Sequence, residues 1–257
     1  MKFLKNIAGH IFAVYALLCF IITMLVVIIP IFLISLLKEP YRAKFLHEVF
    51  ILWMGAYLPL IGCPVFRKGR KNFIEKHNYV VVVNHNSLMD IPVSTPWIPG
   101  PNKTLAKSEM AKIPLFGIIY KAGSILVNRN DDKSRRESLQ KMQETLQMGI
   151  HLCLYPEGTR NKSDKPLQHF HDGAFLTAIK AQKAIIPALI FNTGKILPNH
   201  KKFWLMPYPI SIHFLKPIPT AGLTMENLPG LKAHVHTTME TYYIAYMNNP
   251  IMSDIGF

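Results

Sequence analysis

A stretch of 27 residues without a charged side chain, from Ile11 to Leu37, constrains this chain more than any other feature. About 20 apolar residues are enough for a helix to cross the hydrocarbon core of a bilayer. A secretory signal peptide is the alternative, because Lys2 and Lys5 precede the stretch. However, the stretch is longer than the apolar core of such a signal, and no small-residue cleavage site follows it. We therefore expect a transmembrane helix over about residues 11–37, which tolerates Pro30 within it.

A second charge-free stretch runs from Phe50 to Phe66. It is interrupted by four glycines and prolines, namely Gly55, Pro59, Gly62 and Pro64. This composition suits a helix that lies in the membrane interface, or dips into one leaflet, better than it suits a straight span. We expect an interfacial or re-entrant segment over about residues 50–66.

Basic residues follow this segment at once: Arg67, Lys68, Arg70 and Lys71. Cations beside an apolar segment mark the cytoplasmic side of a membrane and bind anionic headgroups. A solvated basic loop is the alternative interpretation. We expect residues 1–70 to form a membrane-associated segment that contacts a bilayer with anionic headgroups. Residues 71–257 then form one globular domain on the cytoplasmic face.

The chain carries a formal net charge of +14, and 50% of its residues are hydrophobic. The excess of lysine and arginine indicates an anionic partner. The hydrophobicity favours a lipid surface, and we expect no nucleic-acid partner. The three cysteines, Cys19, Cys63 and Cys153, form no C-x-x-C pair, so they predict neither a disulfide framework nor a zinc site. A reducing compartment is favoured.

Short apolar runs alternate with helical segments after residue 78, which predicts an α/β sheet with helices on its faces. The expected strands are Tyr79–Val83, Thr104–Ala106, Ser124–Val127, His151–Leu154, Ala184–Ile190 and Pro209–Phe214. The expected helices are Asp132–Met148, Ala174–Gln182 and Leu231–Met247. The last carries an apolar stripe that we assign to the core or to a membrane-facing surface: Leu231, Val235, Met239, Tyr242, Tyr243 and Tyr246.

One candidate for chemistry is the run VVVNHNSLMD, residues 81–90, in which His85 follows a predicted strand and Asp90 comes five residues later. One short turn would bring the carboxylate back to the imidazole, fix its tautomer and leave Nε2 free as a base. The alternative is purely structural. In that case His85 ends the strand and Ser87 caps a helix, with Asp90 at the third helical position of a capping box.

A second candidate is YPEGTR, residues 155–160, where a strand runs into a turn that Gly158 permits, between Glu157 and Arg160. The planar guanidinium of arginine matches the oxygens of a phosphate. A surface turn with an ion pair is the alternative.

Two further runs are AGSILVNR, which ends at Arg129, and AIIPALIFNTG, where Pro187 indicates an edge strand or a bulge.

In chain order, N-H-x-x-x-x-D, G-x-I-x-V-x-R, Y-P-E-G-T-R and I-I-P-A resemble the four sequence blocks of the glycerolipid acyltransferases. The likeness is greatest to the 1-acyl-glycerol-3-phosphate acyltransferases. It runs from about Val80 to Gly194 and includes LAKSEMAKIPLFG between the first two blocks. The resemblance implies a mixed α/β sheet flanked by helices, an N-terminal membrane-anchoring helical element, and an acyltransferase domain over residues 71–257.

The resemblance also implies roles for individual residues. His85 is the general base that takes the proton of the acceptor hydroxyl, and Asp90 orients it. Pro187 is expected to line the acyl path. The glycerol-phosphate site is formed by Arg129, Glu157, Gly158, Thr159 and Arg160, and the two arginines bind the phosphate. Similar enzymes often carry F-K-x-G after the third block, whereas this chain has FHDG at residues 170–173, so a lysine that assists phosphate binding is absent.

The function implied is transfer of an acyl chain from acyl-CoA or acyl-carrier protein to the sn-2 hydroxyl of lysophosphatidic acid. A thioester is already activated, so this chemistry needs neither a protein nucleophile nor a metal. We expect no cofactor and no metal site, and the chain contains no G-x-S-x-G elbow of a serine hydrolase. The alternatives are acylation of another lysolipid, such as an ornithine-type one, a non-catalytic protein that binds anionic lipid, and a metal-dependent phosphatase.

Overall fold

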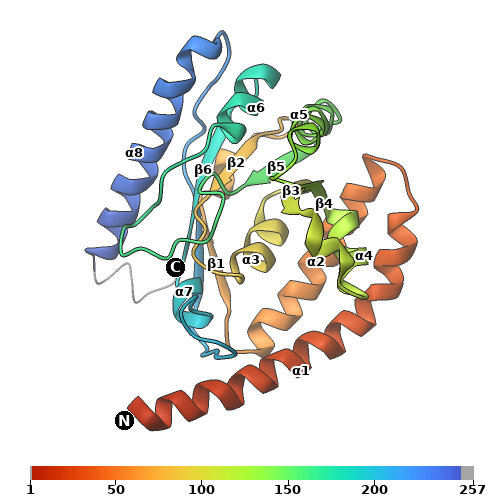
Figure 1. The fold of residues 1–257 in the computed structure, drawn as a ribbon, viewed down its shortest axis with the longest axis vertical. Coiled ribbons are helices and arrows are strands. Elements are labelled where there is room, and N and C mark those ends of the chain that lie inside the picture. Colours follow the sequence, from red (N-terminus) through yellow and green to blue (C-terminus); the bar gives the residue numbers. More distant parts are fainter. Residues whose placement is uncertain (1, 250–257) are drawn as a thin grey trace.

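A seven-stranded sheet forms the centre of the computed structural model, which describes residues 2–249 (Figure 1). Its strands lie in the order β1-β7-β6-β2-β5-β3-β4. Neighbouring strands are parallel except β6 and β7, which pair antiparallel, so the sheet is mixed as predicted. The strands are β1 (Val65–Lys68), β2 (Val80–Val83), β3 (Asn102–Lys107), β4 (Ser124–Val127), β5 (His151–Leu154), β6 (Ile185–Phe191) and β7 (Ile210–Phe214).

Helices cover both faces of the sheet. On one face lie α2 (Tyr41–Leu60), α3 (Asp90–Trp97) and α4 (Phe116–Gly123), with α1 (Lys2–Ser35) packed outside them (Figure 1). On the other face lie α5 (Asp132–Gln147), α6 (Gly173–Ala181) and α8 (Leu228–Met247). The short helix α7 (Thr193–Ile196) follows β6, and single 3-10 turns cover Arg70–Asn72, Ser108–Lys112 and Met225–Asn227.

The central strand β2 shows why the chain forms this three-layer fold. Val81 and Val83 point into the core under α1 to α4, whereas Val80 and Val82 point into the core under α6 and α8. All four valines are fully buried. A strand covered on both faces needs a continuous apolar run instead of an alternating one, and VVVV supplies it.

The predicted elements of the globular part are present. Each of the six expected strands is found with its ends within two residues of the prediction, and the three expected helices are α5, α6 and α8. The apolar stripe of α8 belongs to the core, since Leu231, Val235, Met239 and Tyr246 are buried against the sheet and Tyr242 and Tyr243 pack beside them. The strand β1 and the helix α4 were not predicted. The interfacial helix expected over about residues 50–66 overlaps only the second half of α2, and α3 was expected only in the alternative in which Ser87 caps a helix.

Pro187 lies inside the sheet, so the expectation of an edge strand is wrong, while the expectation of a bulge is confirmed. Its strand β6 pairs with β2 on one side and with β7 on the other. Ala188 pairs with Phe214, but Ile185 pairs with Ile218, so the partner segment carries one extra residue beside the proline. The carbonyl of Pro187 accepts a bond from Leu215 N at 2.8 Å, so its missing N–H faces this bulge.

The structure also corrects the expectation of one interfacial segment over residues 50–66. The helix α2 covers residues up to Leu60, and Trp53, Met54 and Leu58 are buried within the protein. Val65 begins β1, which pairs with β7 ahead of the predicted domain boundary at residue 70. The apolar side chains that suggested contact with lipid pack largely against α1, α3 and the sheet.

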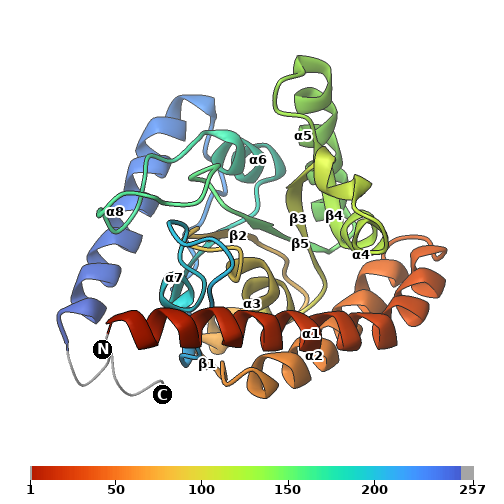
Figure 2. The same ribbon diagram turned by 60° about the horizontal axis from the view of Figure 1, so that its bottom comes forward.

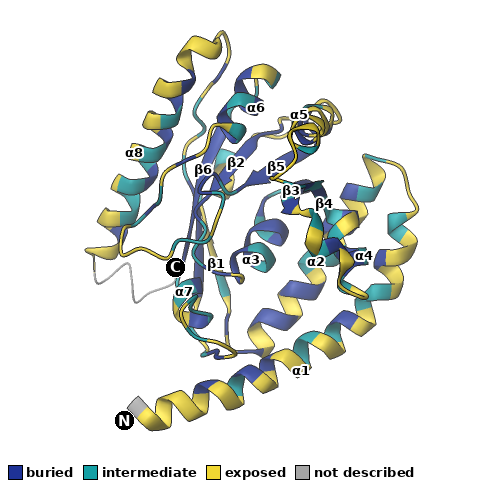
Figure 3. Cartoon of the chain, viewed as in Figure 1, coloured by how far each residue is buried: buried dark blue, intermediate teal, exposed yellow. Residues whose placement is uncertain are grey.

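The helix α1 begins earlier than predicted and lies along one side of the protein (Figure 2). One narrow stripe faces the body and is buried: Gly9, Ala13, Ala16, Met24 and Ile31. Most other positions expose apolar side chains (Figure 3). Among residues 2–249 it is the one helix long and apolar enough to cross a membrane, and 11% of its most apolar window is buried. An apolar face of this extent outside the core places the protein at a membrane.

Small residues let the first turns of α1 approach the loop after α7. A Cβ atom at Gly9 would lie 1.9 Å from Nε1 of Trp204. The Gly9 carbonyl accepts a hydrogen bond from Leu205 N at 3.1 Å, and His10 Nδ1 lies 2.8 Å from the carbonyl oxygen of Phe203. The loop over residues 197–205 is therefore fixed from one side by α1.

We expect Gly9→Ala to separate α1 from this loop, because a methyl group has no space beside the Trp204 indole. Overpacking of this kind lowers the free energy of unfolding by about 1–3 kcal/mol. Hydrogen exchange of the Leu205 amide should become faster. The matched control is Gly230→Ala on α8, where an added Cβ meets nothing within 4 Å. Equal exchange rates at Leu205 in both variants would contradict this account of the packing.

Candidate active site

The candidate residues gather at the carboxyl ends of three neighbouring strands. His85 follows β2, the turn Tyr155–Arg160 follows β5, and α7 with its loop follows β6. In an open α/β sheet, loops at this edge are the usual place for a ligand site. Because β2 lies between β5 and β6, His85 sits between the other two loops.

The predicted turn brings Asp90 back to His85. His85 Nδ1 lies 2.8 Å from Asp90 Oδ2. The same oxygen accepts the backbone N–H groups of Asn86 at 2.6 Å and Ser87 at 2.8 Å. The Asp90 side chain is 1% exposed and that of His85 14%. A carboxylate accepts the proton of Nδ1–H, so this contact selects the tautomer in which Nε2 is free to accept a proton.

The predicted capping box forms only in part. The helix α3 begins at Asp90, and Met89 occupies the N-cap position without a side-chain hydrogen bond. The hydroxyl of Ser87 accepts the Met89 amide at 3.2 Å and donates to the carbonyl of Leu197 at 2.8 Å. Asp90 Oδ2 accepts the Ser87 N–H as the box requires, but the Ser87 hydroxyl accepts the Met89 amide and not that of Asp90. The same carboxylate oxygen also holds the loop that carries His85.

Glu157 joins the β5 turn to His85. Its Oε1 accepts the His85 backbone N–H at 2.7 Å, and its Oε2 accepts the Gln168 N–H at 3.0 Å. The residue is 2% exposed. Burial raises the pKa of Glu157, and the two amides and the nearby His85 oppose that rise. Both oxygens accept main-chain N–H groups and the side chain is buried, so in this structure Glu157 positions His85.

The ring of Tyr155 supports His85 from the same turn. The two rings stack with their centroids 4.4 Å apart, and the Tyr155 hydroxyl lies 2.7 Å from Ser94 Oγ on α3. Burial raises the pKa of Tyr155 well above its usual value, so the phenol stays neutral. Tyr155 was not predicted as a site residue. Its position directly before Pro156 and Glu157 in the YPEGTR motif could have indicated that its ring lies near His85.

The two arginines expected at one phosphate lie on different sides of the β5 turn. Arg129, at the end of β4, donates to the carbonyl of Gly158. Arg160 donates to Asn199 Oδ1 at 3.0 Å on the β6 side. They therefore do not converge in this structure. Arg160 is the arginine beside the Asn86 loop, because Asn199 Nδ2 donates to the Asn86 carbonyl at 2.8 Å.

The turn itself leaves little space around its glycine. Gly158 has φ +70°, and an added Cβ would lie 2.7 Å from Cδ2 of His171. His171, from the FHDG sequence, therefore lies against the turn, and its backbone N–H donates to the Pro156 carbonyl at 2.8 Å. Thr159 is exposed beside it. The histidine thus places an imidazole ring next to Gly158 and near Arg129.

Pro187, which was predicted to line the acyl path, does not lie with the residues around His85. It lies in the middle of β6, and the alternation of the strand puts it on the same face as Ile185 and Leu189, under α6 and α8.

No cluster of three or more histidine, cysteine, aspartate or glutamate side chains that would suit a metal ion occurs within residues 2–249. The expectation of a metal-free site stays a prediction.

A polar cavity of about 490 Å³ opens beside Asn86. Its lining includes Asn161, Lys162, Lys165, Lys195 and Asn199. Asn161 also donates its backbone N–H to the His85 carbonyl at 2.6 Å. Asn161 and Asn199 were not predicted either, because nothing in their local sequence shows that distant loops meet here. A base next to a cavity rich in ammonium groups is suited to deprotonating an anionic substrate.

Comparisons with known proteins find relatives in sequence and in fold. A family model described as Acyltransferase matches residues 65–191. The chain is 30% identical over 201 residues to a 1-acyl-sn-glycerol-3-phosphate acyltransferase of Chlamydomonas reinhardtii, covering 74% of this chain and 59% of that protein. It is 25% identical to the human beta enzyme of the same name, covering 93% and 84%. For the enzyme of that name from Haemophilus influenzae, the identity is 28% and the coverage 73% and 78%.

Among solved structures, the fold is similar to that of the 1-acyl-sn-glycerophosphate (LPA) acyltransferase PlsC from Thermotoga maritima. The TM-score is 0.73 at 20% identity, and the match covers 97% of this chain and 99% of the other.

We expect Glu157→Gln to loosen the loop that carries His85. Glutamine has one acceptor oxygen, so either the His85 or the Gln168 amide loses its partner in a buried place, which costs about 1–3 kcal/mol of unfolding free energy. Hydrogen exchange at His85 or Gln168 should become faster. The control is Glu137→Gln, which changes an exposed carboxylate on α5. A Glu157 variant as stable as the control, with unchanged exchange, would be inconsistent with the bridging role.

Proposed function

This chain belongs to the glycerolipid acyltransferases with the H-x-x-x-x-D motif, and on that premise we propose that it acylates the sn-2 hydroxyl of lysophosphatidic acid. The acyl chain comes from a thioester, either acyl-CoA or acyl-carrier protein, and the product is phosphatidic acid. The single observation that carries the proposal is the 2.8 Å contact between His85 Nδ1 and Asp90 Oδ2 beside a polar cavity.

The reaction follows from the tautomer that Asp90 selects. Nε2 of His85 takes the proton of the acceptor hydroxyl while its oxygen attacks the thioester carbonyl carbon. The tetrahedral intermediate then expels the sulfur, the carbon–sulfur bond breaks, and the sulfur receives the proton from Nε2. One ester forms for each thioester consumed, and one free thiol leaves. Asp90 compensates the positive charge on the imidazole while it holds the proton.

Two contacts place the base for this step. Glu157 holds the His85 main chain, and the Tyr155 ring limits rotation of the imidazole. A preorganised base removes reorientation from the activation barrier. Asp90 therefore orients the imidazole of His85, whereas Glu157 holds the backbone N–H of the same residue.

The acceptor phosphate is assigned to the Arg160 side of the cavity. In lysophosphatidic acid the phosphate is carried by the carbon next to the sn-2 carbon, so it must lie close to the reacting hydroxyl. Arg160 is tied through Asn199 to the loop that follows His85. Arg129 donates to the Gly158 carbonyl, which makes it a support of the turn. Thr159 and Gly158 complete the rim near the substrate.

The exposed face of α1 supports action at a membrane surface, where the lysolipid is dissolved. We place the catalytic domain on the cytoplasmic side, because Arg67, Lys68, Arg70 and Lys71 follow the N-terminal apolar elements. The same cations suit anionic headgroups. This side of the membrane also contains both kinds of thioester donor.

The reaction is tested by mixing the purified, detergent-solubilised full chain with an acyl thioester and lysophosphatidic acid and measuring free thiol. We expect thiol release that requires both substrates. His85→Ala should lower the turnover number by about 10²–10⁴, the usual contribution of a general base. The control is His77→Ala, because His77 is exposed at the opposite end of β2.

Absence of thiol release from the wild-type protein with either donor would refute the proposal and leave a lipid-binding protein as the alternative. Retained turnover in the His85 variant would instead refute only the assignment of the base.

The acceptor is tested with Arg160→Ala. We expect the KM for lysophosphatidic acid to rise roughly tenfold or more, equal to about 1.4 kcal/mol of lost binding per factor of ten. The turnover number should change less, since the phosphate binds in both ground state and transition state. Arg136→Ala, an exposed position on α5, is the control. A larger effect on an acceptor without phosphate would point to another lysolipid as the natural acceptor.

A further inference from the structure

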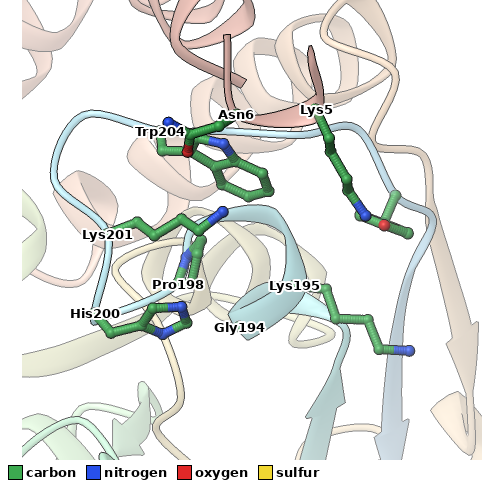
Figure 4. Close-up of a pocket in the computed structure, with 9 residues that line it drawn as sticks. Lys5, Asn6, Gly194, Lys195, Pro198, His200, Lys201 and Trp204 are labelled. Carbon is green, nitrogen blue, oxygen red and sulfur yellow. The ribbon is translucent and has the colours of Figure 1, made fainter. Parts of the chain in front are cut away.

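A second cavity lies between the first turns of α1 and the loop after α7 (Figure 4). It has a volume of about 590 Å³, within the range of about 300–1,000 Å³ that is typical of small-molecule sites. Lys5 and Asn6 of α1 form one wall, and Lys195, Lys201 and Trp204 are among the residues opposite. The cavity belongs to neither the His85 site nor the core.

The cavity is positively charged without compensation. Three of its lining residues are lysines, and none of the lining residues is acidic. Within the described part of the chain, no carboxylate forms an ion pair with Lys5, Lys195 or Lys201. The ammonium group of Lys201 lies 3.8 Å from the ring centroid of Trp204, which holds this charge at the wall. Concentrated positive charge in a concave site favours a polyanion.

The cavity adjoins the polar cavity beside Asn86. It shares Gly194, Lys195, Pro198 and His200 with the polar cavity that reaches Asn86, the neighbour of His85. A ligand with its anionic end beside α1 and its reactive end beside His85 would therefore cross the α7 loop. Such a ligand must be long, with its charge far from its reactive group.

Of the two substrates, only one has this shape. The phosphate of lysophosphatidic acid is too close to the reacting hydroxyl to reach the second cavity. Acyl-CoA carries its phosphates at the far end of the pantetheine arm, next to the nucleoside. A folded carrier protein has a single phosphate at the base of that arm and cannot enter a cavity of this volume.

We propose that the cavity between α1 and the α7 loop binds the phosphates at the nucleotide end of an acyl-CoA donor. This assignment rests on the proposed function. Lys195 and Lys201 contact the phosphates from the loop, and Lys5 contacts them from α1. The N-terminal helix thus contributes to donor binding as well as to membrane attachment.

The test compares three thioesters with the same acyl chain: acyl-CoA, acyl-dephospho-CoA and acyl-pantetheine, which has no phosphate. We expect the double variant Lys5→Ala/Lys201→Ala, which removes the two lysines that line this cavity and not the one beside Asn86, to raise the KM for acyl-CoA roughly tenfold, equal to about 1.4 kcal/mol. The KM for acyl-pantetheine and that for lysophosphatidic acid should stay within a factor of two. Acyl-dephospho-CoA should show an intermediate effect.

Two further variants control for changes in structure. Lys141→Ala removes the same charge from an exposed position on α5, away from both cavities, and should leave all three KM values unchanged. Lys201→Arg keeps a cation over Trp204 and should retain the KM for acyl-CoA within a factor of three. If the double variant fails to fold, the single variant Lys5→Ala gives the same comparison with a smaller rise.

Equal changes for acyl-CoA and acyl-pantetheine, or no change for either, would overturn the assignment. A rise confined to lysophosphatidic acid would overturn it in favour of a lipid-headgroup site. Turnover of acyl-carrier protein without turnover of acyl-CoA would also overturn it, while leaving the acyltransferase function intact. Thiol release by the wild-type protein from acyl-pantetheine separates these outcomes from failure of the function itself.

Discussion

The bond from the His85 backbone to the carboxylate of Glu157 connects the parts of this active site. The carboxylate comes from the turn after β5, and its second oxygen holds Gln168 later in the same β5–α6 connection. Two loops that follow neighbouring strands thus share one buried anion. Burying a carboxylate is unfavourable unless donors surround it, so the site forms only when the β2 and β5 loops meet in one arrangement. Asp90 is a second buried carboxylate surrounded by donors: one of its oxygens contacts His85 Nδ1 and accepts the N–H groups of Asn86 and Ser87.

The residues of the EGTR motif were all predicted to form the glycerol-phosphate site, but in the structure they have different roles. In Glu-Gly-Thr-Arg, the glutamate supports the base, the glycine permits the turn, and the arginine donates to Asn199, which lines the polar cavity. Arg129 braces the turn from β4. Asn199, from the β6 loop, links Arg160 to the Asn86 carbonyl. Loop support and the substrate contact that we propose are thus assigned to different side chains of the same short segment.

Much of the fold could be predicted because its signals are local. The run VVVV must be a strand buried on both faces, and the spacing of Leu231, Val235 and Met239 needs a covered helix face. The His85–Asp90 contact was also predictable, because a single turn closes it. The strand β1 and the partners of Glu157 were not. Val65–Lys68 continues an apolar stretch into a basic one, and only pairing with β7 makes it a strand. Asn199 is 113 positions from the carbonyl it bonds, a contact that no local pattern encodes.

The close packing of Gly9 against Trp204 gives the N-terminal helix a structural role in addition to membrane attachment. The loop that α1 holds in place also carries Asn199, which reaches the Asn86 carbonyl and Arg160. The membrane anchor is therefore part of the packing that holds the catalytic edge of the sheet. It is not only an attachment that could be removed without effect on the active site. Removing the first helix to obtain a water-soluble enzyme would take away one wall of the site's own scaffold. The natural unit of this protein is the domain together with the lipid surface that its first helix occupies.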